Sequence, residues 1–364
     1  MVSDTGGAGG AGAAGAAGAV VVVEDDTDAP PAVTAREALA RRAHLDPSDV
    51  EAVTSLVRRA TDADGVAPLS EHVLLHLRRG GEEPGVHLLA HEDGGLVGYA
   101  HLDPTDPVEG ASAELVVDPR HRRAGHGRRL VETLVALSEE LADGRLRLWA
   151  HGEAPDAAAL AAAMGFTRAR ELWQMRRSLH AALPRPVVPD DLHVRTFRPD
   201  DAEAVLAVNG AAFAEHPEQG RWTRADLDAR LAERWFDPAG LFLAFDARPG
   251  SDGELLGFHW TKVHGGHDGH DGHDEGHDGE AGHDHSPIGE VYVVGVSPAA
   301  QGRGLGRLLT LVGLCHLRAR GLDQAMLYVD ADNTAAVRTY TSLGFSRWDV
   351  DVQFRRDVDG PTTT

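Results

Sequence analysis

The sequence predicts two tandem α/β domains, each built on a mixed α+β sheet with helices packed beside it. Three observations support this prediction: an internal repeat at constant spacing, an alternation of strands and helices within each repeat, and a length of 364 residues that suits two domains. Hydrophobic residues make up 42% of the chain and charged residues 25%, as in ordinary globular proteins. The chain therefore has enough apolar side chains for two cores.

Four matched blocks define the repeat, and the members of each pair are 179 residues apart, as Val117 is from Val296. A fifth pair lies upstream at a spacing of 159 residues, so the second copy contains an extra segment of about 20 residues between two equivalent strands. Such regular self-similarity indicates two copies of one structural unit. The matched blocks are 117–119 with 296–298, 122–127 with 301–306, 164–166 with 343–345, 174–177 with 353–356 and, upstream, 96–99 with 255–258.

Both copies predict one order of elements: a helix, two strands, a valine-rich strand, a Gly-rich turn, a long helix, a strand, a short helix that ends at Gly-Phe, and a final strand. Strands that alternate with helices are typical of α/β domains. The predicted elements are helices 47–57 and 200–208, strands 86–91, 96–101, 241–246 and 255–263, strands 113–117 and 290–296, helices 128–141 and 307–320, and strands 145–150 and 324–329.

Composition sets the domain boundaries. A Gly/Ala-rich and then acidic stretch predicts a disordered tail over 1–33, and three prolines predict a linker over 181–192. The seven histidines of 264–285 could bind Zn²⁺ or Ni²⁺, but a Gly-rich repeat has no fixed ligand geometry. We therefore interpret 264–285 as a solvated loop and expect no metal requirement. The predicted domains are 34–180 and 193–358, followed by a tail over 359–364.

Charge excludes one class of partner. Asp and Glu number 57 against 35 Lys and Arg, for a formal net charge of −22, which is the wrong sign for a protein that neutralises nucleic-acid phosphates. The single cysteine permits no intrachain disulfide, and no apolar run is long enough for a membrane span. The N-terminus also lacks the basic region of a signal peptide. We expect a cytoplasmic monomer that acts on a small molecule, without nucleic-acid or membrane partners.

The most informative motif is a strand followed by Pro-x-x-[Gln/Arg]-x-x-Gly-x-Gly and a helix, and it occurs in both copies. Small residues let backbone N–H groups approach a pyrophosphate at the positive end of a helix. The turn is neither the dinucleotide-binding fingerprint nor a Walker A loop, because the other residues of those motifs are missing. A simple tight turn is the alternative, but two copies in the same context favour phosphate binding.

These residues resemble a known family. The segments VVGVSPAAQGRGLGRLL (293–309) and VVDPRHRRAGHGRRL (116–130) resemble the coenzyme-binding motif of the GNAT N-acetyltransferases, and Asn-x-x-Ala-x-x-x-Tyr-x-x-x-Gly-Phe (333–345) resembles a second motif of that family. The resemblance covers residues 36 to 357. It implies acetyl-CoA as co-substrate, bound by Leu115, Val116, Val117, Arg122, Arg123, Ala124, Gly125, His126, Gly127 and Arg128 in the first copy, and by Val294, Gly295, Val296, Gln301, Gly302, Arg303, Gly304, Leu305, Gly306, Arg307, Asn333, Thr334, Ala335, Ala336, Val337 and Arg338 in the second.

A tandem branch of this family, the mycothiol synthases, is similar over 64–74, 216–223, 235–245, 257–264 and 327–345. This resemblance implies acetylation of the cysteinyl amine of cysteinyl-glucosaminyl-inositol. It also implies that the substrate is contacted by Glu71, Glu218, Lys262, Glu290 and Tyr328. Lys262 is the only lysine beside 34 arginines, which suits a site that needs a compact ammonium group.

Acetyl transfer to an amine needs a base for the ammonium proton and an acid for the departing thiolate. The resemblance makes Glu290 the base and Tyr340 the acid; a solvent-facing edge-strand charge and a packing residue are the respective alternatives. The 179-residue spacing places Ala161 at the position of Tyr340, and Ala111 at that of Glu290, or Glu114 after a register shift. We therefore expect the first copy to be structural or to bind acetyl-CoA without turnover.

Two alternative functions remain. The first is acetylation of another amine, such as an aminoglycoside, a peptide N-terminus or a polyamine. The second is a non-catalytic acetyl-CoA-binding protein.

Overall fold

The computed structural model describes residues 22–23, 37–78, 85–214, 217–251, 253–265 and 287–357. These residues form two compact units: unit 1 lies within 1–107 and 111–144, and unit 2 within 108–110 and 145–364. Most of the predicted tail 1–33, the insert from 266 to 285, and the tail 359–364 lie outside the described residues. The division of the chain at 181–192 stays a prediction; residues 181–191 contain neither helix nor strand.

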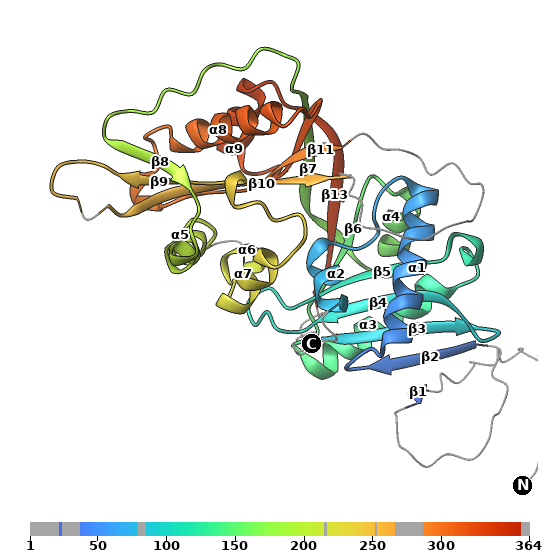
Figure 1. Ribbon diagram of the computed structural model, residues 1–364. Coiled ribbons are helices and arrows are strands. Elements are labelled where there is room, and N and C mark those ends of the chain that lie inside the picture. Colours follow the sequence, from blue (N-terminus) through green and yellow to red (C-terminus); the bar gives the residue numbers. More distant parts are fainter. Residues whose placement is uncertain are drawn as a thin grey trace, which may run out of the picture. The chain divides into compact units, whose positions relative to one another are not determined.

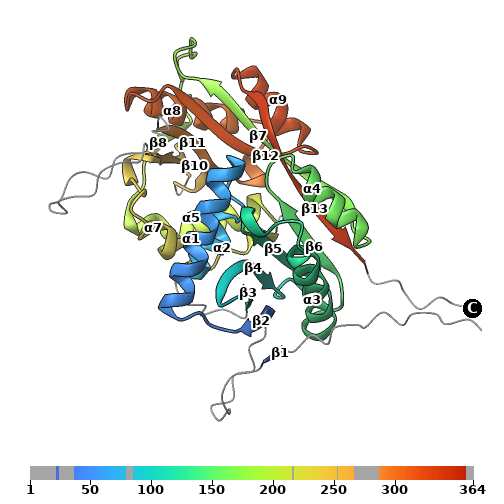
Figure 2. The ribbon, with the colours of Figure 1, turned by 90° about the vertical axis from the view of Figure 1, so that its right-hand side faces the viewer.

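Unit 1 is a sheet in the order β1-β2-β3-β4-β5, with α1 and α3 on opposite faces (Figures 1 and 2). Among the described strands of this unit, β1 pairs with β2 in parallel, and the pairs β2–β3, β3–β4 and β4–β5 are antiparallel. Strand β1 lies within the predicted tail. The core of unit 1 contains Leu56 of α1 and Tyr99 of β4. The elements are β1 (Val22–Val23), β2 (Glu37–Arg42), α1 (Pro47–Asp64), α2 (Glu71–Arg78), β3 (Val86–Glu92), β4 (Gly95–Asp103), β5 (Ala111–Val117), a 3₁₀ turn (Pro119–His121) and α3 (His126–Leu141).

Unit 2 is a sheet in the order β6-β13-β7-β12-β11-β10-β9-β8. Helix α8 covers one face of strands β9 to β11, and α5 lies on the other face (Figure 1). The elements are β6 (Leu146–Ala150), α4 (Pro155–Ala163), β7 (Thr167–Ser178), β8 (Leu192–Thr196), α5 (Ala202–Ala212), α6 (Pro217–Gly220), α7 (Arg224–Leu231), β9 (Leu241–Asp246), β10 (Leu255–His264), β11 (Ile288–Val296), α8 (Leu305–Ala319), β12 (Gln324–Asp330), α9 (Thr334–Ser342) and β13 (Ser346–Arg356), with 3₁₀ turns at Pro199–Asp201, Pro238–Gly240 and Pro298–Ala300.

The final strands of the two sequence repeats are exchanged. Strand β7 ends the first repeat but pairs with β12 of the second, with Leu327 opposite Met175. Strand β13 ends the second repeat and lies between β7 and β6, with Gln353 opposite Trp149. Residues 145–180 therefore pack in unit 2, although the repeat assigns them to the first copy.

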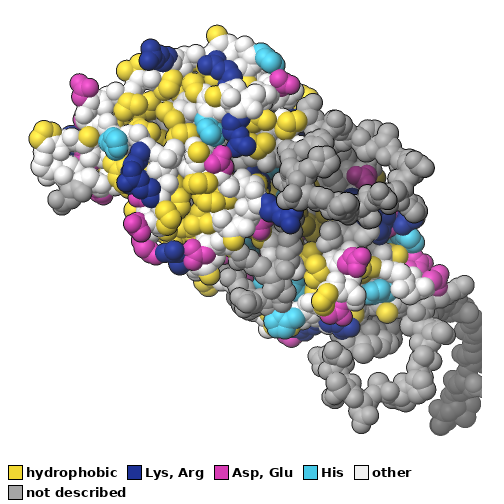
Figure 3. Space-filling model, in the orientation of Figure 1, with side chains coloured by type: hydrophobic (Ala, Val, Ile, Leu, Met, Phe, Trp, Pro, Cys, Tyr) yellow, Lys and Arg dark blue, Asp and Glu magenta, His cyan; other side chains and the backbone are white. Residues whose placement is uncertain are grey.

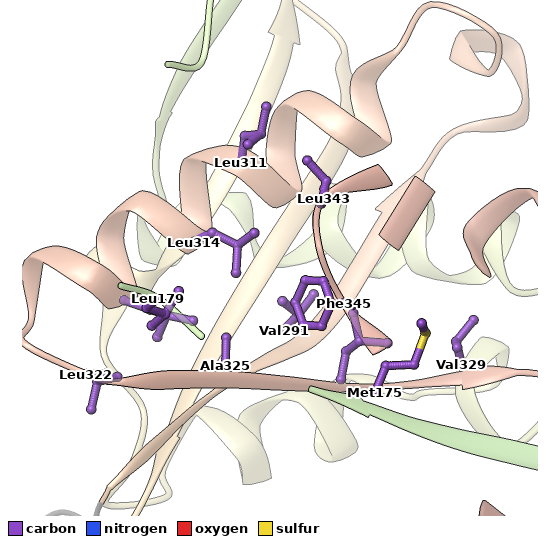
Figure 4. Close-up of a cluster of buried hydrophobic side chains, with 12 residues drawn as sticks. Met175, Leu179, Val291, Leu311, Leu314, Leu322, Ala325, Val329, Leu343 and Phe345 are labelled. Atoms are coloured by element: carbon purple, nitrogen blue, oxygen red, sulfur yellow. The ribbon is translucent and has the colours of Figure 1, made fainter. Parts of the chain in front are cut away.

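The core beneath α8 joins both repeats. One buried cluster contains Leu311 and Leu314 of α8, Val291 of β11, Ala325 of β12 and Met175 of β7 (Figure 4). Removing such a buried leucine costs about 2–5 kcal/mol. The stability of the second copy thus depends partly on a strand from the first.

Local signals explain where α1 begins and ends. The Asp46 carboxylate accepts the backbone N–H of Asp49 at 2.8 Å, Pro47 occupies the first turn, and Gly65 ends the helix at φ +73°. The helix runs seven residues past the predicted end at 57, to Asp64. Among the described residues, no helix is both long and apolar enough to cross a membrane.

Candidate active site

A bulge in β11 sets the position of Glu290. On β10, Trp260 pairs with Val293 but the next residue, Thr261, pairs with Val291, so Tyr292 is an extra residue in β11. Such a bulge turns side chains that would otherwise alternate between the faces of a sheet. Tyr292 therefore joins Val293 and Trp260 in the cluster beneath α5, and Glu290 returns to that same face.

Glu290 is buried and has two basic neighbours. The residue is 6% exposed, and it lies directly opposite Lys262 on β10. Nε2 of His264 lies 2.7 Å from Oε2 of Glu290 and donates to it when it carries the proton. His264, the last residue of β10, is thus a direct partner of the predicted base.

Lys262 lies between two aromatic rings. Its Nζ is 4.5 Å from the ring centre of Trp235 and 5.2 Å from that of Tyr292, and the residue is 9% exposed. An ammonium group over aromatic faces is stabilised by cation–π attraction. The Tyr292 hydroxyl accepts a hydrogen bond from Nε of Arg230 at 3.1 Å. The site thus combines a carboxylate and an ammonium group with aromatic walls.

Strands β11 and β12 pair over only a short distance. The parallel ladder joins Gly289–Val291 to Ala325–Leu327, and among the described residues it does not continue toward Val296. Beyond Val291, β11 stays paired with β10 on its other side. Backbone groups directed toward β12 are therefore available to a ligand, next to the predicted cofactor residues 294–296.

Tyr340 comes from the α8 side of the sheet. It lies on α9, half-buried, with its ring 5.9 Å from that of Phe345, and it borders the same apolar cluster as Val294. Burial raises the pKa of Tyr340 to about 12, so its hydroxyl stays protonated at neutral pH.

Tyr328 lies on β12, two residues beyond Met326, the partner of Glu290 across the ladder. This spacing places Tyr328 on the face that carries Glu290. Its hydroxyl accepts a hydrogen bond from Nε2 of Gln174 at 2.8 Å. Burial of the hydroxyl raises its pKa to about 12, although 40% of the residue is exposed.

The second-copy turn has the backbone geometry of an anion-binding site. Gly302 and Gly304 both have φ +78°, and a Cβ on either would meet no atom within 4 Å. Gly304 caps α8 without a side-chain hydrogen bond, so the first N–H groups of the helix remain open. The other predicted cofactor residues here are Val294, Gly295 and Val296 at the end of β11, Gln301 and Arg303 in the turn, Leu305, Gly306 and Arg307 in the first turn of α8, and Thr334, Ala335, Ala336, Val337 and Arg338 in α9. Asn333 caps α9, where its Oδ1 accepts the N–H of Ala336 at 3.0 Å.

The first-copy turn has the same shape with a different residue. Gly125 has φ +99° and caps α3, again without a side-chain hydrogen bond, while Arg123 stands where the second copy has Gly302 and has φ +64°. Arg122 makes two hydrogen bonds to Asp64, at 2.7 and 2.6 Å. The other predicted residues are Leu115, Val116 and Val117 at the end of β5, Ala124 in the turn, and His126, Gly127 and Arg128 at the start of α3. The His126 ring is buried, 3.2 Å from Glu92.

Strand pairing gives the counterpart of Glu290 in the first copy. Asp103 occupies the position equivalent to Lys262, and it pairs with Ser112. The counterpart is therefore Ser112, and neither Ala111 nor Glu114, because the bulge at Tyr292 adds one residue to β11.

The other two predicted substrate residues are placed by their helices. Glu71 is the first residue of α2 in unit 1, and Glu218 lies in α6 with a side chain outside the described part of the structure. Their roles stay predictions. Figure 3 shows basic and acidic side chains interspersed on the face toward the viewer, as expected for a chain that is not built around one phosphate-binding surface.

Comparisons with known proteins agree with this geometry. The profile of the Acetyltransferase (GNAT) family matches residues 209–345, and that of an Acetyltransferase (GNAT) domain matches residues 83–168. A GCN5-related N-acetyltransferase from Sphaerobacter thermophilus is 25% identical, with a TM-score of 0.59 over 87% of this chain and 95% of that one. A tandem GNAT protein from the clavulanic acid biosynthesis pathway is 20% identical, with a TM-score of 0.63 over 90% of this chain and 99% of that one, and shares the fold.

Curated relatives narrow the family. The mycothiol acetyltransferase of Streptosporangium roseum is 52% identical, with 86% of this chain and 98% of the relative covered. That of Streptomyces avermitilis is 51% identical, with 92% of this chain and 100% of the relative covered. The chain belongs to the GNAT acetyltransferases and, within them, to the mycothiol acetyltransferases.

Proposed function

We propose that the second copy transfers the acetyl group of acetyl-CoA to the cysteinyl amine of cysteinyl-glucosaminyl-inositol, which yields mycothiol and CoA. The observation that carries this proposal is the position of Glu290. It is buried opposite Lys262, and its own strand, β11, leads to the uncapped start of α8. The names of the relatives support the choice of substrate.

The chain would hold acetyl-CoA in two ways. The N–H groups at the start of α8 would face the pyrophosphate, and the backbone of Val294–Val296, beyond the ladder with β12, would offer partners to the amide-bearing arm. Backbone N–H groups near Val294–Val296 would stabilise the oxyanion of the tetrahedral intermediate.

Glu290 would take the proton of the amine. An α-amine has a pKa of about 7.7–8.0, so much of it is protonated at neutral pH and must lose a proton before attack. Glu290 accepts this proton, directly or through a water, while His264 holds Oε2 in place. The new C–N bond then forms at the acetyl carbon.

Tyr340 would protonate the leaving group. As the C–S bond breaks, the thiolate takes the hydroxyl proton of Tyr340, which a pKa of about 12 keeps available throughout the neutral range. Glu71, Glu218, Lys262 and Tyr328 would contact the substrate amine and hydroxyls.

The first copy would bind acetyl-CoA without turnover. It keeps the turn before α3, but it has Ser112 in place of Glu290 and Ala161 in place of Tyr340. We further infer a cytoplasmic monomer whose turnover requires no metal, which gel filtration and an assay in EDTA test.

The decisive experiment is turnover by the purified full chain, with products identified by mass spectrometry because the substrate thiol interferes with thiol-based detection of CoA. We expect one acetyl group on the cysteinyl amine. Aminoglycosides, polyamines and a peptide N-terminus serve as competing substrates. Faster acetylation of any of these, or binding of acetyl-CoA without turnover on every amine, would overturn the proposal.

A further inference from the structure

Unit 1 contains three histidines whose rings converge. His87 of β3 and His101 of β4 are direct partners across the sheet, and His76 comes from α2. One ring nitrogen from each lies within 4.8 Å of the other two. His87 is 1% exposed and His101 is 3% exposed, so the cluster is mostly shielded from water.

The second copy shows that the fold does not need polar side chains here. Trp260 stands at the position equivalent to His101, and it pairs with Leu241 on one side and Val293 on the other, all three in the apolar core. In unit 1 the corresponding layer is His87, His101 and Glu114. Replacing a packed apolar layer by buried polar groups costs free energy unless those groups have partners. Glu114 already accepts the backbone N–H of Ser70, and His87 lies beside the Tyr99 hydroxyl. A ligand bound by the converging histidines would account for the rest of the replacement.

The hydrogen-bond pattern of the ring nitrogens suits metal ligands. Nδ1 of His101 is buried and has no hydrogen-bond partner among the described atoms, and Nδ1 of His87 lies 2.7 Å from the Tyr99 hydroxyl. When Nδ1 of His87 donates to that hydroxyl, Nε2 keeps its lone pair, as is common for metal-binding histidines.

Gly85 allows the rings to approach the backbone. A Cβ at this position would lie 2.8 Å from Cε1 of His101 and 2.9 Å from Nε2 of His76. Zinc–nitrogen bonds of about 2.0–2.1 Å require tetrahedral ligand nitrogens roughly 3.3 Å apart, so small side-chain rotations would close the cluster on an ion.

From this geometry we propose that unit 1 binds one divalent transition-metal ion, with zinc as the probe, through His76, His87 and His101. A set of three imidazoles suits zinc, copper or nickel rather than magnesium or calcium. All three histidines belong to unit 1, whereas Glu290 and Tyr340 belong to unit 2. The ion would stabilise the first copy and take no part in acetyl transfer.

The test measures zinc bound by the full chain after dialysis with a competing chelator. Because the histidines of 264–285 could also bind zinc, the informative quantity is the difference in bound zinc between variants. We expect His101→Ala to lose one equivalent relative to the parent. His91→Ala, on β3 with His87 but outside the cluster, should lose none. Gly85→Ala, which keeps all three rings, should weaken this site at least tenfold. An unchanged stoichiometry in His101→Ala would overturn the proposal.

A second variant tests the proposal in case His101→Ala does not fold. The combined change His87→Leu, His101→Trp and Glu114→Val installs the apolar layer of the second copy, so it can fold without the ion. We expect zinc to raise the melting temperature of the parent by several degrees more than that of this variant. Equal shifts would show that zinc acts elsewhere, and the site would be rejected. Co²⁺ substitution gives an independent readout, since visible absorption bands of a tetrahedral site should appear only in the parent and His91→Ala.

Discussion

The two copies share a phosphate-type turn but differ in the strand that leads into it. In the second copy, the extra residue Tyr292 returns Glu290 to the face of Lys262, whereas the unbulged first copy pairs Ser112 with Asp103 at the same place. The turn itself is conserved in shape, with a left-handed glycine before each long helix. We therefore propose that cofactor binding and proton transfer are separable in this fold, with the turn responsible for the first and the bulged strand for the second.

The largest effect is expected from a change of the proposed general base, Glu290. Glu290→Gln keeps the size of the side chain but removes proton abstraction, so we expect turnover to fall about 10²–10⁴-fold while acetyl-CoA binding is retained. Steady-state kinetics and a binding titration measure the two properties. Glu114→Gln, a buried carboxylate of the first copy, is the matched control and should keep turnover within about twofold. Similar losses in both variants would contradict the assignment of Glu290.

A second pair of variants compares the turns directly. Gly304→Glu places bulk and negative charge at the start of α8, where the phosphates would bind, and should reduce turnover at least about 100-fold. Gly125→Glu makes the same change before α3. We expect it to remove one of two acetyl-CoA sites in an equilibrium titration while turnover falls only through lost stability. A count of one site in the parent, or equal kinetic damage, would break the proposed division of labour.

The proton donor should have a smaller effect. Tyr340→Phe is expected to lower kcat about tenfold, because water can replace the hydroxyl as acid. Donation is lost only when pH rises through the pKa of about 12, so this group should cause no alkaline decline in kcat below about pH 11. Tyr328→Phe is the control, since a substrate contact should change KM more than kcat. An unchanged kcat in Tyr340→Phe would reduce Tyr340 to a packing residue.

Much of this site could be predicted from the sequence because its signals are local. The left-handed glycines before α8, the strand that carries Glu290, and the helix that carries Tyr340 all follow from spacing within a few residues. The bulge at Tyr292 could not be predicted, because it depends on the pairing of β11 with β10. The hydrogen bond between His264 and Glu290 follows from the same pairing and was missed for the same reason.

Features formed by distant residues were also missed. The exchange of β7 and β13 could not be predicted, because the partners of these strands are set by pairing with residues far away in the sequence. The cluster of His76, His87 and His101 joins a helix to two strands, and the only signal was indirect: aligning the repeats places histidine where the second copy has Leu241 and Trp260. Short helices α2, α6 and α7 were not predicted because each has at most eight residues.

The smallest effect is expected at the turn position where one copy has arginine and the other glycine in a left-handed conformation. Arg123 has φ +64°, a conformation that costs an L-residue about 1–2 kcal/mol, whereas Gly302 has φ +78° without that cost. Glycine loses about 0.5–1 kcal/mol more than alanine through its greater freedom in the unfolded chain. The net gain from Arg123→Gly relative to Arg123→Ala should therefore be about 0.75 kcal/mol, within a range of about 0–1.5 kcal/mol. The alanine variant is the correct reference because it removes the arginine side chain but keeps the Cβ. The reciprocal change Gly302→Ala should destabilise the chain by a similar amount, and urea unfolding followed by circular dichroism measures all three. If Arg123→Gly is no more stable than Arg123→Ala, the first-copy turn relaxes without a left-handed residue at 123, and its likeness to the second-copy turn is looser than the dihedral angles indicate.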